Sequence, residues 1–193
     1  MDQQLPSYWT YFDLEQARGA RDFRDLGQIA LRVLRRMSEN GPVIQVCGPI
    51  TTGGLGSLSQ NLARFQTAVE ILKADDYNVF DQMPFQSFMI KLVDAGLSGR
   101  DLLEDFYGPI FASGLVQFLF FLPLWETSAG AKWERQRAFL YRLPFADYPN
   151  DLLTMAESAK ALFQTSFSER GSDVQIQNSI TAGRFSAGAR VGS

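Results

Sequence analysis

Residues 115–134 read LVQFLFFLPLWETSAGAKWE, and this stretch decides the fold class that the sequence predicts. Its first half is an apolar run typical of a buried strand, and its second half contains a turn and then a helix that carries Glu134. Ligands of α/β proteins bind beyond the carboxyl ends of parallel strands. We therefore expect Ser128, Gly130 and Glu134 to lie at a binding edge of a sheet.

Strands and helices alternate along the rest of the chain. Apolar residues recur at helical spacing from Phe23 to Met37, before the stop at Asn40-Gly41-Pro42. Further strands are predicted over 43–47, 77–80 and 143–146, and further helices after Ser57, near 86–95, near 99–112, over 129–141 and over 150–163. This order predicts an α/β fold, a three-layer α/β/α sandwich around a mostly parallel sheet.

The chain is predicted to have three parts. Residues 1–42 form an N-terminal helical extension, in which residues 1–19 show no clear period. Residues 43–163 form the α/β domain. Residues 164–193 are rich in Ser, Gly, Ala and Gln without a sustained period, which predicts a flexible C-terminal tail.

The composition is that of a soluble globular chain, and it excludes several chemistries. Of the 193 residues, 46% are hydrophobic and 20% are charged. The formal net charge of -3 provides no field for a nucleic-acid duplex, so we expect no such partner. The chain has no histidine and one cysteine, which excludes imidazole triads, Cys-His pairs and zinc sites rich in His or Cys. We expect neither a metal nor a cofactor.

The single cysteine and the apolar runs predict the compartment. A lone Cys47 cannot form an internal disulfide, and the start of the sequence has no apolar targeting segment. The longest apolar run, residues 115–125, is too short to span a bilayer. We therefore expect a cytoplasmic protein without a membrane partner.

A glycine-rich loop over residues 48–56 follows the first predicted strand and precedes a helix. Glycines let backbone N–H groups approach an anion, and the positive end of the helix adds to this attraction. The loop lacks the Gly-Lys-Ser/Thr of a Walker loop, and a plain tight turn with Ser57 as the helix N-cap is the alternative. A simple N-cap is likewise the alternative for Ser128.

Three carboxylates are candidates for chemistry at the same edge. Glu134 lies about one turn into its helix, although most glutamates are solvated. Asp81 directly follows the second predicted strand. Asp105 heads the segment before the central strand, and we favour it over Asp101 and Glu104, whose spacing is equally typical of a solvated helical face.

Several motifs together resemble the nucleoside 2-deoxyribosyltransferase-like superfamily over residues 43–147. The motifs are Gly48-Pro49-Ile50-Thr51 after the first strand, Asn61 and Phe65 in the next helix, the run from Leu122 to Glu134, and Ala138. The Ser-x-Gly-x-x-x-Glu spacing within that run is also similar to that of the 2'-deoxynucleoside 5'-phosphate N-hydrolases.

The resemblance implies a flavodoxin-like five-stranded sheet, a homo-oligomer, and cleavage or transfer of the N-glycosidic bond of a nucleoside or nucleoside 5'-monophosphate. Glu134 would be the nucleophile that forms a covalent glycosyl-glutamate, and Asp105 the acid that protonates the departing base. Residues expected to bind the sugar, phosphate or base are Gly48, Ile50, Thr51, Thr52, Gly53, Gly54, Asp81, Trp125, Ser128 and Gly130.

Two residues depart from the pattern of the superfamily. Gln45 stands where the family often has a tyrosine, and Pro49 stands where the phosphate-binding relatives carry a serine. A proline supplies neither a hydroxyl nor an N–H. These departures favour an alternative function, a non-catalytic module that binds or senses a nucleotide or nucleotide-sugar in the same pocket.

Overall fold

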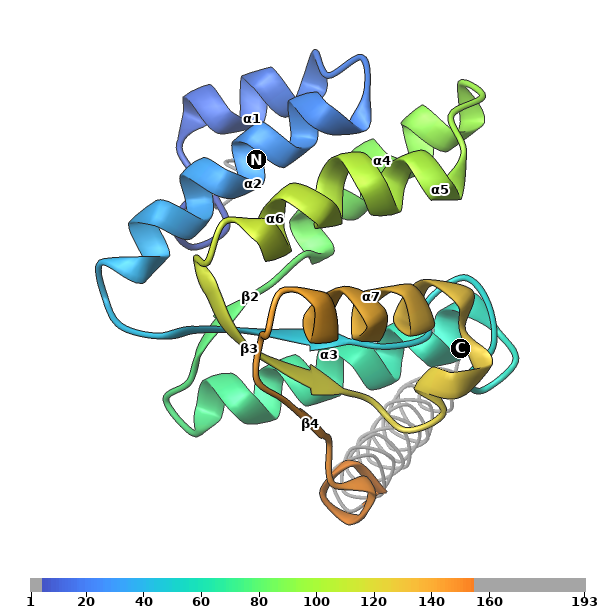
Figure 1. The fold of residues 1–193 in the computed structure, drawn as a ribbon. Helices are drawn as coiled ribbons and strands as arrows, with labels where there is room; N and C mark the ends of the chain where they lie inside the picture. Colours follow the sequence, from blue (N-terminus) through green and yellow to red (C-terminus); the bar gives the residue numbers. More distant parts are fainter. Residues whose placement is uncertain (1–4, 155–193) are drawn as a thin grey trace, which may run out of the picture. The chain divides into compact units, whose positions relative to one another are not determined.

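A computed structural model describes residues 5–154 of the chain (Figure 1). The chain divides into two compact units, residues 1–150 and residues 151–193. In the first unit, four parallel strands form one sheet in the order β2-β1-β3-β4. The strands are β1 (Val43–Cys47), β2 (Asn78–Phe80), β3 (Val116–Phe121) and β4 (Phe145–Asp147).

The sheet confirms the predicted α/β fold and its parallel strands. Strand β3 ends at Phe121, earlier than the apolar run suggested, because Leu124 takes a left-handed φ of 67° and begins the turn into the next helix. The fifth strand that the resemblance implied is not found among residues 5–154.

Helices account for most of the remaining described chain. The α-helices are α1 (Tyr11–Arg18), α2 (Phe23–Ser38), α3 (Leu58–Ala74), α4 (Gln86–Asp94), α5 (Gly99–Asp101), α6 (Gly108–Ala112) and α7 (Ala129–Leu140). Two 3-10 turns, η1 (Met83–Phe85) and η3 (Trp125–Thr127), and a π-helical segment, η2 (Leu102–Tyr107), complete the set. The segments α5, η2 and α6 follow one another without a break and together cover the helix predicted over residues 99–112.

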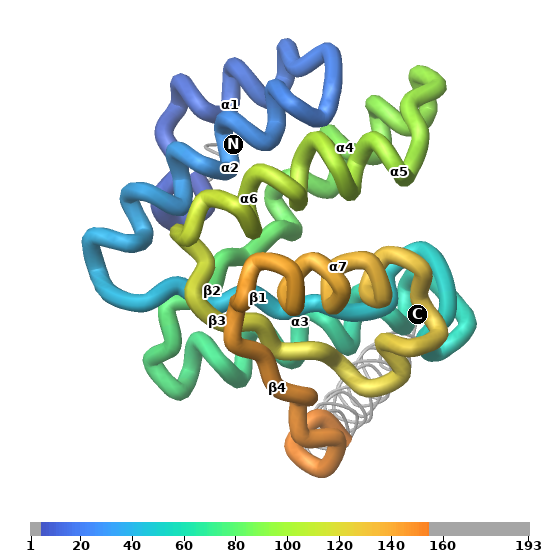
Figure 2. Tube along the Cα trace, in the orientation of Figure 1, coloured from blue at the N-terminus to red at the C-terminus, as the bar shows by residue number. Residues whose placement is uncertain are grey.

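The helices form two layers, one on each face of the sheet. Helix α3 contacts β1 and β2 from one face, and Figures 1 and 2 show α6 and α7 on the other. Helix α2 contacts β1, β2 and η2. The helices before residue 43 belong to the same compact unit as the sheet.

The order of the strands creates a crevice at their carboxyl ends. The chain moves from β1 to one neighbour, β2, and then crosses back to the other neighbour, β3. Right-handed crossovers in opposite directions place α3 and α7 on opposite faces. The helices that follow β1 and β3 thus leave toward opposite faces of the sheet, and open α/β sheets bind ligands at such a point.

The last predicted helix, over residues 150–163, is described only in part. Residues 150–154 are helical, as predicted. The rest of this helix and the predicted tail over 164–193 lie outside the described residues. Across residues 5–154, we find no helix with both the length and the apolar character needed to cross a membrane.

Helix α1 was not predicted, because residues 1–19 lack an apolar period. The helix begins after Thr10, whose hydroxyl accepts from the Asp13 N–H while the Asp13 carboxylate accepts from the Thr10 N–H. Asp13 is fully buried and forms ion pairs with Arg32 and Arg36 of α2. Burial alone would raise the pKa of Asp13, but the hydrogen bonds from Thr10 and Arg32 and the charge of Arg36 outweigh it and hold the pKa below its ordinary 3.8. This network fastens α1 to α2.

The buried Asp13 provides a test of this attachment. Asp13→Asn keeps the shape but leaves two arginines without their shared counter-charge, so we expect the free energy of unfolding to fall by about 2 to 3 kcal/mol in urea denaturation followed by circular dichroism. The matched control is Glu15→Gln, because the Glu15–Arg18 pair is exposed and should contribute less than about 1 kcal/mol. Equal losses in the two variants would contradict the proposed role of Asp13.

Candidate active site

A cavity of about 520 Å³ opens at the carboxyl ends of the strands. The loop after β1, the segment after β2, the start of α7 and the helical stretch from α4 to η2 all contribute to its lining. Its volume lies within the range of small-molecule sites. The predicted site residues that line this cavity are Gly48, Ile50, Thr51, Thr52, Ser128, Gly130 and Glu134.

Glu134 is the acidic residue of this cavity. It lies in the second turn of α7, and only 5% of its surface is exposed. Burial raises the pKa of Glu134 to about 8, although a hydrogen bond from the Cys47 thiol opposes this shift. The carboxyl is therefore mostly protonated at neutral pH. Among the described residues that line the cavity, no other Asp or Glu occurs.

Cys47 and Tyr107 share the electrostatic environment of Glu134. Cys47 is the last residue of β1 and is fully buried, while Tyr107 lies at the end of η2 and is 6% exposed. Burial raises the pKa of both groups well above their ordinary values, and the charge of Glu134 raises each further. A negative charge on any one of these groups therefore disfavours charge on the others.

The glycine loop is held in place by Asn61, which is buried in the first turn of α3. The Asn61 side-chain N–H groups donate to the carbonyls of Ile50 and Gly53 at 3.1 and 3.0 Å, and its side-chain oxygen accepts from the Leu55 N–H at 2.8 Å. Gly54 has a φ of +67°, and an added Cβ would lie 2.3 Å from the Asn61 Oδ1. This position therefore requires glycine.

Thr127 connects the glycine loop to the second loop of the site. Its hydroxyl accepts from the Gly54 N–H at 2.7 Å and donates to the Leu124 carbonyl at 2.6 Å. Gly53, at a φ of +69°, lies so close to Thr127 that a Cβ would meet its backbone oxygen at 2.4 Å. Gly53 and Gly54 therefore serve the packing of the loops and do not line the cavity.

Ser128 is both the N-cap of α7 and a residue of the cavity lining. Its hydroxyl accepts from the Ala131 N–H at 3.3 Å, which makes it the N-cap of α7. It also lines the cavity together with Ala129, Gly130 and Ala131. The amino end of α7, where a helix dipole is positive, is thus part of the cavity wall.

Asp105 does not reach the cavity, in contrast to its predicted role as the acid. Its carboxylate accepts a hydrogen bond from the Arg24 Nε at 3.1 Å and forms an ion pair with that residue of α2. The helix is π-helical from Leu102 to Tyr107, which changes the angle between successive side chains. Leu103 and Tyr107 line the cavity, whereas Asp105 points to α2.

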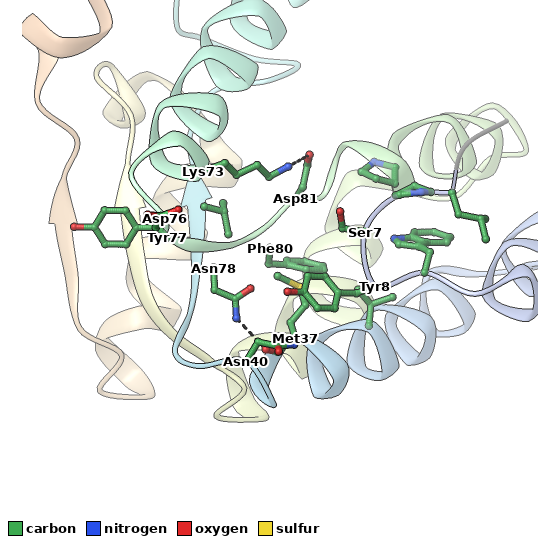
Figure 3. A pocket seen from close by; sticks show the side chains of 16 residues that line it. Ser7, Tyr8, Met37, Asn40, Lys73, Asp76, Tyr77, Asn78, Phe80 and Asp81 are labelled. Carbon is green, nitrogen blue, oxygen red and sulfur yellow. Dashed lines mark hydrogen bonds and ion pairs between the residues drawn. The ribbon is translucent and has the colours of Figure 1, made fainter.

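Asp81 lies at a second cavity of about 640 Å³, which is lined by residues 5–9, by α2 and by β2 with its flanking residues (Figure 3). Its carboxylate pairs with Lys73 at 2.9 Å and also accepts from the Met83 N–H. The neighbouring Gln82 lines the Glu134 cavity instead, because the chain leaves β2 and turns into η1 at this residue, whose φ is −84° and ψ is −8°. Of the two acidic side chains at this second cavity, Asp76 is exposed to solvent and Asp81 is ion-paired with Lys73. We therefore assign the functional site to the cavity of Glu134, although the second cavity is the larger of the two.

Trp125 does not line the Glu134 cavity. The guanidinium of Arg135 lies 4.2 Å from the centroid of its ring, and the ring of Phe121 packs against it at 5.9 Å. The predicted stacking of a base on Trp125 is therefore replaced by a cation-π contact within the protein.

Several lining residues were not predicted from the sequence. Tyr107, Gln82 and Gln86 bring polar groups, and Arg100 is the only cation among the described residues of the lining. The remaining unpredicted residues are mostly aliphatic and come from η1, α4, α5 and η2 and from the starts of α3 and α7. The strand end that identified Asp81 could also have indicated Gln82, but no local pattern indicated Tyr107, because the π-helical turn was not predicted.

Over the residues that the structure describes, no group of three or more Cys, Asp or Glu side chains lies in a geometry that could hold a metal ion. Comparisons with family models, with curated proteins and with solved structures find no match for this chain. The assignment of a function therefore depends on the geometry of the site.

The raised pKa of Glu134 predicts a stability that depends on pH. The folded protein retains a proton on Glu134 up to about pH 8, whereas the unfolded chain releases it near the ordinary value of 4.5. Because the folded state holds this extra proton, the free energy of unfolding should fall by about 1.4 kcal/mol for each unit of rising pH between roughly pH 4.5 and 8. Glu134→Gln should remove this slope and raise the melting temperature at pH 8 but not at pH 4. The exposed Glu126→Gln in the preceding turn is the control, and an unchanged slope in Glu134→Gln would contradict the burial argument.

The thiol of Cys47 should lower the pKa of Glu134. Cys47→Ala removes the hydrogen bond to the carboxyl, so the pKa of Glu134 should rise above that of the wild type. Cys47→Ser retains a donor and should bring the pKa back toward the wild-type value. The measurement is the titration of the Glu134 carboxyl by carbon-13 NMR, with Glu134→Gln to assign the signal. A titration that is the same in all three proteins would show that the thiol has no such effect.

Proposed function

We propose that this chain cleaves or transfers the N-glycosidic bond of a nucleoside or nucleoside 5'-monophosphate through a covalent intermediate on Glu134. The observation that carries the proposal is the buried Glu134 carboxyl in a cavity at the strand ends of an α/β sheet. The motifs of residues 43–147 that resemble the nucleoside 2-deoxyribosyltransferase-like superfamily support the same role for Glu134.

The buried carboxylate suits a transition state with positive charge on the sugar. When the bond between the base and the anomeric carbon lengthens, an oxocarbenium-like charge develops on the sugar. An ionised Glu134 in a poorly solvated site stabilises that charge more strongly than a carboxylate in water would. Attack of a Glu134 oxygen on the anomeric carbon then forms a glycosyl ester as the base departs with the bond electrons.

The second half of the reaction regenerates the enzyme. Water or a second base attacks the anomeric carbon, the ester bond breaks, and Glu134 leaves as a carboxylate. The departing base takes its proton from water in this proposal. Asp105 is paired with Arg24, and the raised pKa of Tyr107 makes its hydroxyl a poor proton donor at neutral pH.

The polar part of the cavity would hold the sugar or its phosphate. Thr51 and Thr52 contribute from the loop after β1, and Ser128 and Gly130 contribute from the start of α7. The amino end of α7 and Arg100 are the positive elements of the lining, and both attract an anion.

The second candidate function is a module that binds such a ligand without chemistry. It is favoured by the protonation of Glu134 at neutral pH and by the position of Asp105 outside the cavity. Binding and catalysis differ in their products, so the two functions can be separated experimentally.

The test is a panel of nucleosides and nucleoside 5'-monophosphates, assayed for released base by chromatography and for binding by thermal shift. We expect base release that Glu134→Gln lowers by at least about a thousandfold, together with an increase in the intact mass of the wild type by one glycosyl group. Because the active form is ionised, kcat/KM should rise with pH and level off above about pH 8. Glu126→Gln should retain full activity. Stabilisation without base release would select the binding module, and full activity in Glu134→Gln would refute the catalytic role.

A further inference from the structure

The Glu134 cavity has two walls of different chemistry. The wall formed by the strand-end loops and α7 contains the hydroxyls of Thr51, Thr52 and Ser128 as well as the carboxyl. The opposite wall comes from η1, α4, α5 and η2, and most of it is aliphatic. Its aliphatic residues are Met83, Met89, Ile90, Val93, Leu102 and Leu103, and its polar residues are Gln86, Arg100 and Tyr107.

The aliphatic wall is partly hydrated in the free protein. Ile90 is 47% exposed and Val93 is 45% exposed, although both side chains line the cavity. They lie three residues apart on α4 and therefore on one face of that helix. A ligand that covers them would remove apolar surface from water, which favours binding.

The aliphatic wall does not match the polar edge of an unmodified base. A nucleobase carries ring nitrogens and amino or carbonyl groups, and these lose binding free energy when they are desolvated without hydrogen-bond partners. Aliphatic side chains provide no such partners. The side-chain oxygen of Gln82 accepts from Gln45 at 3.3 Å, and Gln86 and Tyr107 are the other uncharged polar side chains beside the aliphatic surface.

We propose that the departing group of the substrate carries an apolar substituent, an alkyl or aryl group attached to the base, which packs on Ile90 and Val93. The proposal rests on the proposed function for the orientation of the substrate, with the sugar toward Glu134 and the substituent toward α4. It makes Ile90 and Val93 specificity-determining residues. The cavity of about 520 Å³ is large enough for a substituted nucleoside, which is a ligand of ordinary drug size.

The test compares adenosine with N6-benzyladenosine, which differ by one apolar group. Dissociation constants measured by titration calorimetry should favour the benzyl compound by about tenfold or more in the wild type. The double variant Ile90→Ser/Val93→Ser should reduce this preference to about threefold or less. Phe139→Ser is the control, because Phe139 is 82% exposed on α7 and does not line the cavity.

The outcomes separate this proposal from the proposed function. A preference for the benzyl compound that depends on Ile90 and Val93 supports the proposal whether or not base is released, because it is measured by binding. Equal affinities, or a preference that survives the double variant, would overturn it. Sedimentation velocity of the double variant tests the other occupant of this wall: if the variant dissociates an oligomer and the ligand preference is absent, the wall is a contact between copies of the chain and the proposal is wrong.

Discussion

The enclosure of one carboxyl group beneath the strand ends is the constraint on which the rest of this structure depends. Burial makes ionisation of Glu134 unfavourable and raises its pKa to about 8, and the Cys47 thiol compensates for only part of this effect. No ion pair to Glu134 is found within residues 5–154. A buried acid that lowers stability at neutral pH is typical of a functional site, since packing alone would favour an apolar residue at this position.

The surrounding loops are built to keep the carboxyl in a defined place. Helix α7 carries Glu134, and the N-cap Ser128 sets where that helix begins. Thr127 then ties the start of α7 to the glycine loop, and Asn61 ties the same loop to α3. Because α3 and α7 lie on opposite faces of the sheet, these hydrogen bonds join both helical layers across the crevice.

Much of the fold and a third of the residues that line the cavity followed from local patterns. The strands over 43–47 and 77–80 and the helices over 86–95, 99–112 and 129–141 are confirmed, because apolar periodicity reflects which side of an element is buried. Glu134, Ser128 and the loop after β1 were found by their place after a predicted strand. Helix α1 was missed because a capping box and one buried Asp13 stabilise it in place of an apolar stripe. Asp105 was misplaced because the π-helical segment turns its side chain toward Arg24.

By itself, the sequence determined the α/β class, the parallel sheet and the absence of histidine chemistry, because composition and hydrophobic period are local properties of the chain. Only the tertiary structure decided which polar residues share a cavity. It brought Tyr107, Cys47 and Glu134 together from η2, β1 and α7, and it placed Asp81 and Asp105 elsewhere. The reason is physical: burial and electrostatic coupling depend on distances between segments that are far apart in the sequence, and no local pattern encodes those distances.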